Sequence, residues 1–261
     1  MTLLSVPGTL WLSLVLDWSA AAIFCVLAAE FLQRRVRDHA VRFANVLFAL
    51  WWLGLGVSNF VSGLRVILVS IDMPLTVLIG LSFVSSAAVA VGLAGLLYYL
   101  IFLFTGRSVF LWPLLVFYAG FCGWIIHSHA RWQPIGVDVG AWSTSFIHAQ
   151  PYSDAYRLSV LAALVAPQLI AVLLLIALAA RLPRSAARVR MFVVALSVTT
   201  YIGNSFAASL YPDDTGWLLV GEIVPVVVGL AVLFAYRPPS WLPWRLPPEM
   251  PATLQRGATR P

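Results

Sequence analysis

Three charged side chains lie inside long apolar stretches of this sequence: Asp17, Arg65 and Glu222. An ionisable group within a membrane span is costly, and most such groups face a partner, an ion pathway or a ligand. At about 1.5 Å of rise per helical residue, all three fall at nearly the same depth within the helices expected around them. The spacing therefore predicts that Arg65 meets both carboxylates in one half of a helix bundle.

Three polar side chains at similar or somewhat greater depth extend this predicted cluster: Asn59, Tyr201 and Asn204. With the three charged residues they form the candidate ligand-binding site, a polar pocket open to the outside. Two other interpretations remain open. The charges could form a structural ion pair that fixes helix packing, or each could extend singly to the membrane surface.

Histidines offer a second kind of chemistry. His127 and His129 fall at the end of an expected helix, and His148 lies in the loop that follows. Imidazole is a ligand of zinc and of haem. On a continuous helix the first two would point to nearly opposite sides, so they could share a metal only where the helix has ended. Solvated or interfacial histidines are the simpler interpretation, and we predict no cofactor.

The elements that carry these residues follow from the composition. Hydrophobic residues make up 61% of the chain and charged residues 10%, against about half and a quarter in soluble domains. A run of about 18 or more apolar residues spans a bilayer as a helix. We therefore predict an all-α, polytopic integral membrane protein in which residues 1–236 form a seven-transmembrane-helix bundle. The expected helices cover about 9–32, 43–70, 74–104, 109–127, 157–180, 189–210 and 217–236, with an outer loop at 128–156 and a proline-rich tail at 237–261.

Arginine placement predicts the orientation. The chain has 16 arginines and no lysine; 13 arginines follow the first, third and fifth helices or lie in the tail. Only Arg131 and Arg157 lie in the other loops. Because cytoplasmic loops are rich in basic residues, we expect the C-terminus in the cytoplasm and the N-terminus outside. Glu30, near the inner end of the first helix, is expected to pair with Arg34 or to lie at the interface.

These basic inner loops are expected to contact anionic lipid of the bilayer, or a cytoplasmic or membrane protein partner. Nucleic acid is not expected as a partner, because the arginines lie in short loops between apolar runs rather than in one basic surface.

Two further patterns predict local structure. In the outer loop Ile135, Val137 and Val139 alternate with other residues and Gly140 offers a turn, which favours a short β-hairpin over the outer mouth of the bundle. An irregular loop is the alternative. The small-residue run SSAAVAVGLAG at 85–95 permits close helix approach, so the third helix is predicted to be central.

Several activities are excluded or unsupported. Without a lysine the chain cannot form a retinal Schiff base. It contains no phosphate-binding glycine loop, no HExxH and no nucleophile elbow, so we do not expect an enzyme.

Over about residues 9–236, the helix count, topology and arginine-rich loops resemble the seven-helix sensory regions of bacterial membrane signalling proteins. This resemblance implies a receptor or sensor of unknown ligand in the bacterial inner (cytoplasmic) membrane. Its ligand would bind in the outer half, and kinks at Pro167 and Pro225 would relay motion inward.

Two alternatives remain. The stretches GVSNFVSGL (56–64) and IGNSFAASL (202–210), with the pair Pro167-Gln168, resemble the repeats of PQ-loop and SWEET transporters. That resemblance implies a small-solute transporter with a polar path to both sides. The other alternative is a membrane haem or metal protein that uses the outer histidines.

Overall fold

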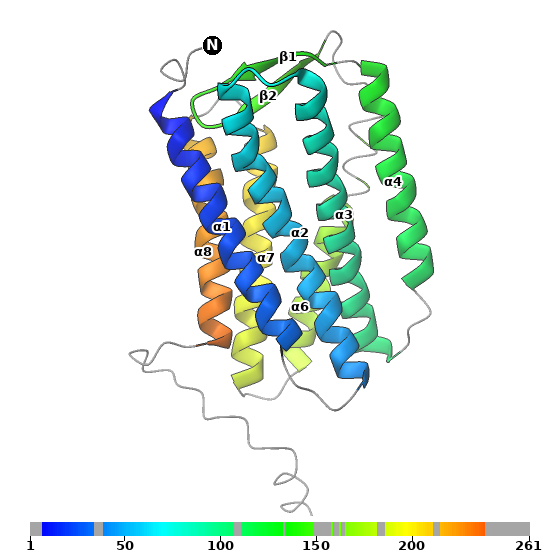
Figure 1. The fold of residues 1–261 in the computed structure, drawn as a ribbon. Coiled ribbons are helices and arrows are strands. Elements are labelled where there is room, and N and C mark those ends of the chain that lie inside the picture. The colour runs from blue at the N-terminus through cyan, green and yellow to red at the C-terminus, as the bar shows by residue number, and fades with distance from the viewer. Residues whose placement is uncertain are drawn as a thin grey trace, which may run out of the picture.

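A computed structural model of the chain describes residues 7–33, 39–106, 111–132, 134–148, 158, 162, 165–181, 186–210 and 215–237. This part of the chain is mostly helical, with seven α-helices and one two-stranded sheet (Figure 1). The elements are α1 (Gly8–Gln33), α2 (His39–Ser70), α3 (Leu75–Thr105), α4 (Leu111–Trp132), β1 (Pro134–Val139), β2 (Thr144–His148), α6 (Ala166–Arg181), α7 (Ala186–Leu210) and α8 (Thr215–Tyr236).

Four of these helices are long and apolar enough to cross a membrane, which supports a membrane protein. Their apolar spans are Gly8–Gln33, Val41–Ser70, Leu75–Thr105 and Gly216–Tyr236. Two shorter apolar stretches, Trp112–Trp124 and Ala166–Arg181, lie in α4 and α6.

Six of the described helices pack in a closed ring. α1 lies between α2 and α8, α3 packs beside α2, and α6 and α7 complete the ring from α3 to α8. α4 packs against α3 from outside the ring (Figure 1). The third helix contacts α2, α4, α6 and β1, but it forms part of the ring, so the prediction that it is central in the bundle is not confirmed.

Some helix ends differ from the predicted ones. α2 begins at His39 rather than near residue 43, and α4 continues to Trp132 rather than ending near residue 127. Both extensions include polar or charged residues, which continue a helix although they fall outside the apolar run that predicted it. The predicted span 157–180 is described chiefly from Val165 onward; Val165 is π-helical and leads directly into α6, which contains Pro167. Residues 238–261 of the expected tail lie outside the described residues.

The core is aromatic in the half of the bundle away from the hairpin. Phe24, Phe48 and Trp52 are each at most 2% exposed. The Trp52 ring lies 5.6 Å from that of Phe24 and 5.8 Å from that of Phe48, centroid to centroid. Phe31 continues this layer toward the far end, edge-on to Phe48 at 4.7 Å. We call these four residues the aromatic layer.

The backbones of α2 and α3 touch where small residues face each other. A Cβ atom added to Gly54 would collide with the Ala88 carbonyl oxygen and lie 3.1 Å from Gly92 Cα. One added to Gly95 would lie 3.2 Å from Leu50 Cβ. The small-residue run of α3 therefore does pack closely, as the sequence predicted.

A β-hairpin covers one end of the bundle, as predicted, and rules out the irregular loop (Figure 1). β1 and β2 pair antiparallel with Val139 opposite Thr144, and the Gly140 N–H donates to the Ser143 carbonyl at 3.0 Å. Val139 packs on a small cluster of apolar side chains from α1 and α2, namely Leu10, Leu14 and Val66. We refer to this end as the hairpin end.

The glycine contact makes a direct prediction. Gly54→Ala should lower the apparent melting temperature of the purified protein in detergent, because overpacking a close contact costs about 1–3 kcal/mol. Gly80→Ala in α3 is the matched control, since a Cβ there meets nothing within 4 Å. That change should be neutral or slightly stabilising, by up to about 1 kcal/mol. Equal melting temperatures for the two variants would contradict the close packing.

Candidate functional site

The buried stripe of α1 carries Asp17 toward the interior of the bundle. Buried residues recur along this helix at helical spacing, at Leu10, Leu14, Ala21, Phe24 and Ala28 among others, and Asp17 falls in the same series. It is partly buried and lies against α2, because a Cβ added to Gly63 would come within 3.4 Å of Asp17 Cβ. Asp17 therefore faces a neighbouring helix rather than extending singly to the membrane surface.

Arg65 and Glu222 approach Asp17 from the two helices that flank α1. Arg65 is on α2 and Glu222 on α8, and the guanidinium interacts electrostatically with both carboxylates, which also repel each other. From the hairpin-end termini of α1, α2 and α8, the three residues lie about 14, 8 and 10 Å along the helix axes. The structure thus brings together the three charged residues that the sequence singled out.

Their arrangement is looser than a salt bridge. Within the described residues, no nitrogen of Arg65 lies within 4 Å of a carboxylate oxygen of Asp17 or Glu222. The Arg65 guanidinium carbon instead lies 5.9 Å from the centre of the Phe146 ring on β2, and its buried Nε has no hydrogen-bond partner. The charges therefore attract one another across more than 4 Å, and the guanidinium lies against an aromatic ring instead of pairing directly with a carboxylate.

The polar residues predicted for the site lie around the charged ones. A hydrogen bond joins the side chains of Asn59 and Tyr201, and the Asn59 amide also donates to the Leu55 carbonyl at 2.7 Å. Asn204 faces α8 one residue before Glu222, since a Cβ added to Gly221 would lie 3.8 Å from Asn204 Nδ2. Among the described residues, the buried Asn204 Oδ1 has no hydrogen-bond partner. We call Asp17, Arg65 and Glu222, with Asn59, Tyr201 and Asn204, the polar cluster.

Two neighbours of the cluster were missed from the sequence. The Ser13 hydroxyl hydrogen-bonds to the Glu222 carboxylate. Ser13 precedes Asp17 by four residues and so shares its face of α1, a spacing that could have indicated it. No spacing in the sequence could have indicated Phe146, because its contact with Arg65 depends on how the hairpin packs over the bundle.

The hairpin forms the roof of the cluster. Besides Phe146 over Arg65, the Thr9 hydroxyl at the start of α1 donates a hydrogen bond to the Ala141 carbonyl in the turn. Val139 meets Leu14, which lies one turn from Asp17. The start of α1 and the hairpin, which are far apart in sequence, are therefore held together directly above the charged residues of the site.

The histidines do not gather. α4 continues through both His127 and His129, so the two positions are separated by roughly 200° around the helix. His127 is exposed, and His148 lies in β2 beside Phe146, with ring centroids 6.4 Å apart. In the described part of the chain, no three His, Cys, Asp or Glu side chains are grouped to hold a metal ion.

Glu30 has a different described partner from the one expected. Arg237, just past α8, approaches its carboxylate with Nε at 2.6 Å from Oε2. Arg34 lies outside the described residues. The contact arises because the ends of α1 and α8 lie side by side, where Phe31 also meets Tyr236 edge-on at 4.9 Å. It ties the two helices together at the end opposite the hairpin.

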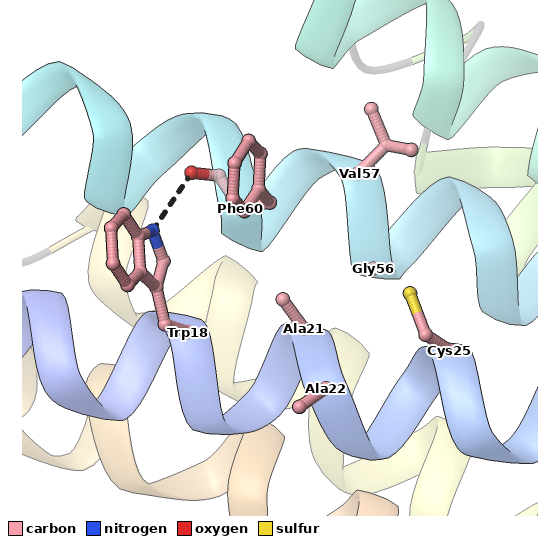
Figure 2. Close-up of a pocket in the computed structure, with 7 residues that line it drawn as sticks. All are labelled: Trp18, Ala21, Ala22, Cys25, Gly56, Val57 and Phe60. Carbon is pink, nitrogen blue, oxygen red and sulfur yellow. Dashed lines mark hydrogen bonds between the residues drawn. The ribbon is translucent and has the colours of Figure 1, made fainter.

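An apolar groove of about 380 Å³ opens sideways between α1 and α2 (Figure 2). At one end Trp18 stacks on Phe60 and donates from Nε1 to the Phe60 carbonyl at 3.3 Å. Gly56 and Cys25 lie toward the other end. The groove lies on the outer face of the ring, where its apolar lining suits lipid; the exposed thiol of Cys25 is its one reactive group among the lining residues.

Comparison with known proteins identifies no relative: no family model, curated protein or solved structure matches the chain.

The geometry predicts the effect of removing the only cation of the polar cluster. Arg65→Ala should destabilise the protein by about 3 kcal/mol, because it leaves two partly buried carboxylates without a positive neighbour. The measurement is the apparent melting temperature in detergent.

Arg181→Ala is the matched control. Arg181 also lies over an aromatic ring, 5.2 Å from the centre of Phe104, but it is exposed at the end of α6. Its loss should cost less than about 1 kcal/mol. If Arg65→Ala were as stable as the control, the electrostatic role of Arg65 would be refuted.

Proposed function

We propose that this chain is a seven-span, non-enzymatic membrane receptor or sensor that binds a small polar or charged ligand at the polar cluster. The observation that carries this proposal is the position of the cluster. Charges from α1, α2 and α8 gather inside an apolar bundle, directly beneath the hairpin. Charged groups inside an apolar bundle usually belong to a binding site or to a structural ion pair. The separation of Arg65 from the two carboxylates favours a binding site.

The proposed orientation puts the hairpin end outside the cell. The described arginines other than Arg65 support it, because five of the six lie at or beyond helix ends opposite the hairpin: Arg42, Arg181, Arg188, Arg190 and Arg237. The sixth, Arg131, lies in the last turn of α4 at the hairpin end. Two aspartates, Asp72 and Asp138, are exposed at the hairpin end. An excess of arginine on one side is typical of the cytoplasmic face.

The aromatic layer favours a receptor over a transporter. A transporter needs a polar path that reaches both membrane surfaces in turn. In the described core, the region beyond the polar cluster is filled by buried rings, with Trp51, Trp52 and Phe24 each at most 1% exposed. A solute that reaches the cluster from the hairpin end therefore meets closely packed apolar side chains below it.

Labelling from outside tests the orientation. In a background of Cys25→Ala and Cys122→Ala, a membrane-impermeant maleimide should label Asp138→Cys in intact cells. Arg181→Cys should be labelled only after permeabilisation. Both positions are exposed, so accessibility to solvent does not explain a difference. The reverse pattern would overturn the proposed topology.

A ligand panel tests the receptor proposal itself. Small anionic, cationic, zwitterionic and neutral solutes are titrated against the purified protein in detergent, with melting temperature as the readout. At least one solute should stabilise the wild type saturably, and Arg65→Gln should weaken that effect. In proteoliposomes the same solute should not be accumulated. Uptake that depends on Arg65 would favour the transporter, and no stabilisation by any class would argue for a purely structural ion pair.

A further inference from the structure

The β-hairpin touches the polar cluster through a charged side chain, Arg65. Its guanidinium carbon lies 5.9 Å from the centre of the Phe146 ring on β2, a distance at which an aromatic ring attracts a cation. Phe146 faces the bundle, because alternate residues of a strand point to the same side and Thr144, two residues earlier, is buried. The contact therefore crosses the boundary between the hairpin and the charged residues beneath it.

Two kinds of partner attract this guanidinium in opposite directions. Asp17 lies deeper in the bundle, about 14 Å from the hairpin-end terminus of its helix against about 8 Å for Arg65. Within the described residues, no nitrogen of Arg65 comes within 4 Å of an oxygen of Asp17 or Glu222, although both carboxylates attract it. Direct pairing of a guanidinium with a carboxylate is a strong interaction in apolar surroundings. Pairing with Asp17 would draw the guanidinium inward, away from the Phe146 ring.

The other attachments of the hairpin are concentrated at its turn. The Thr9 hydroxyl donates a hydrogen bond to the Ala141 carbonyl, and Val139 packs on the small apolar cluster of α1 and α2. A cavity of about 260 Å³ lies between β1 and the turn that joins α2 to α3, with Val137 and Leu78 in its lining. Protein interiors are normally close-packed, and segments with incomplete packing open at a lower cost in free energy. The hairpin thus has unfilled space along β1.

We infer that the β-hairpin is a lid over the polar cluster and that Arg65 is its latch. With the lid closed, as in this structure, the guanidinium lies against Phe146. With the lid raised, the same guanidinium turns inward and pairs with Asp17 or Glu222, which offsets part of the contact that is lost. As control of access to a ligand site this inference rests on the proposed function, whereas the latch itself requires only the contacts described above.

The reactivity of a thiol at position 13 measures the opening of the lid. Ser13 is 2% exposed and lies one helical turn after Thr9, the residue bonded to the hairpin. Ser13→Cys is combined with Cys25→Ala and Cys122→Ala, and the purified protein in detergent reacts with a cationic and an anionic methanethiosulfonate. A buried thiol reacts through the open state, so the rate reports how often the lid opens. A change shared by both reagents excludes an effect of reagent charge.

Phe146→Leu tests the ring side of the latch. It should speed the reaction about tenfold, equivalent to about 1.4 kcal/mol, because the contact with the guanidinium is lost. Ile147→Val is the matched control: Ile147 is exposed on the opposite face of β2, and its shortening should leave the rate within about twofold of the parent. In an Arg65→Met background, Phe146→Leu should no longer change the rate. Thr9→Val should speed the reaction with or without Arg65, because it releases a different anchor.

Asp17→Asn tests the inward side of the latch. It should slow the reaction, because the guanidinium loses a partner that favours the raised lid. Removing a nearby negative charge would by itself favour the thiolate and speed the reaction, so a slower rate does not come from the chemistry of the thiol. Asp72→Asn is the matched control and should leave the rate unchanged. Asp72 is exposed at the same end of the bundle, and its φ of 54° is one that asparagine readily adopts.

The outcomes separate the latch from the proposed ligand site. Equal rates for Phe146→Leu and Ile147→Val, or a faster reaction of Asp17→Asn, would overturn the inference. A thiol that reacts only in denatured protein, in every variant, would do the same. If a solute of the ligand panel stabilises the protein but the effect of Phe146→Leu persists without Arg65, the latch fails and the ligand site stands. If the rates follow the latch but no solute stabilises the protein, the lid stands and the ligand site fails.

Discussion

Inside an apolar bundle, charge has to be compensated by other protein groups or by a bound ligand, because no bulk water is present to solvate it. In this chain that constraint falls on Asp17, Arg65 and Glu222, which come from three adjacent helices. Each helix must hold its residue at one depth and on its inward face. The order α2, α1, α8 around the ring and the inward stripe of α1 both satisfy this requirement.

The two ends of the bundle are held by different kinds of contact. At the hairpin end, a β-hairpin placed far along the chain packs over the first helix and covers Arg65 with Phe146. At the other end, Arg237 and Tyr236 fasten α8 to Glu30 and Phe31 of α1. Between them, α2 and α3 touch at Gly54 and Gly92. The polar cluster thus lies between the hairpin and the contacts that hold α1 to α8 and α2 to α3.

Much of this could be predicted from the sequence, because in a membrane protein hydrophobic length and small-residue runs follow directly from the environment. The alternation of Ile135, Val137 and Val139 likewise indicated the hairpin. Helix ends were less predictable, since polar residues extend α2 and α4 past their apolar runs. The contacts of Phe146 and Arg237 depend on tertiary arrangement alone, and no local pattern indicates them.

The aromatic layer has an electrical consequence. Packed apolar rings resist the passage of ions, so in the proposed orientation most of the membrane voltage falls across the half of the bundle that contains Phe24, Phe48 and Trp52. The polar cluster lies on the other side of that barrier, close to the hairpin end. A charged ligand entering from outside would cross only a small part of the electric field. Its occupancy would then follow the composition of the external solution and depend little on the energetic state of the cell.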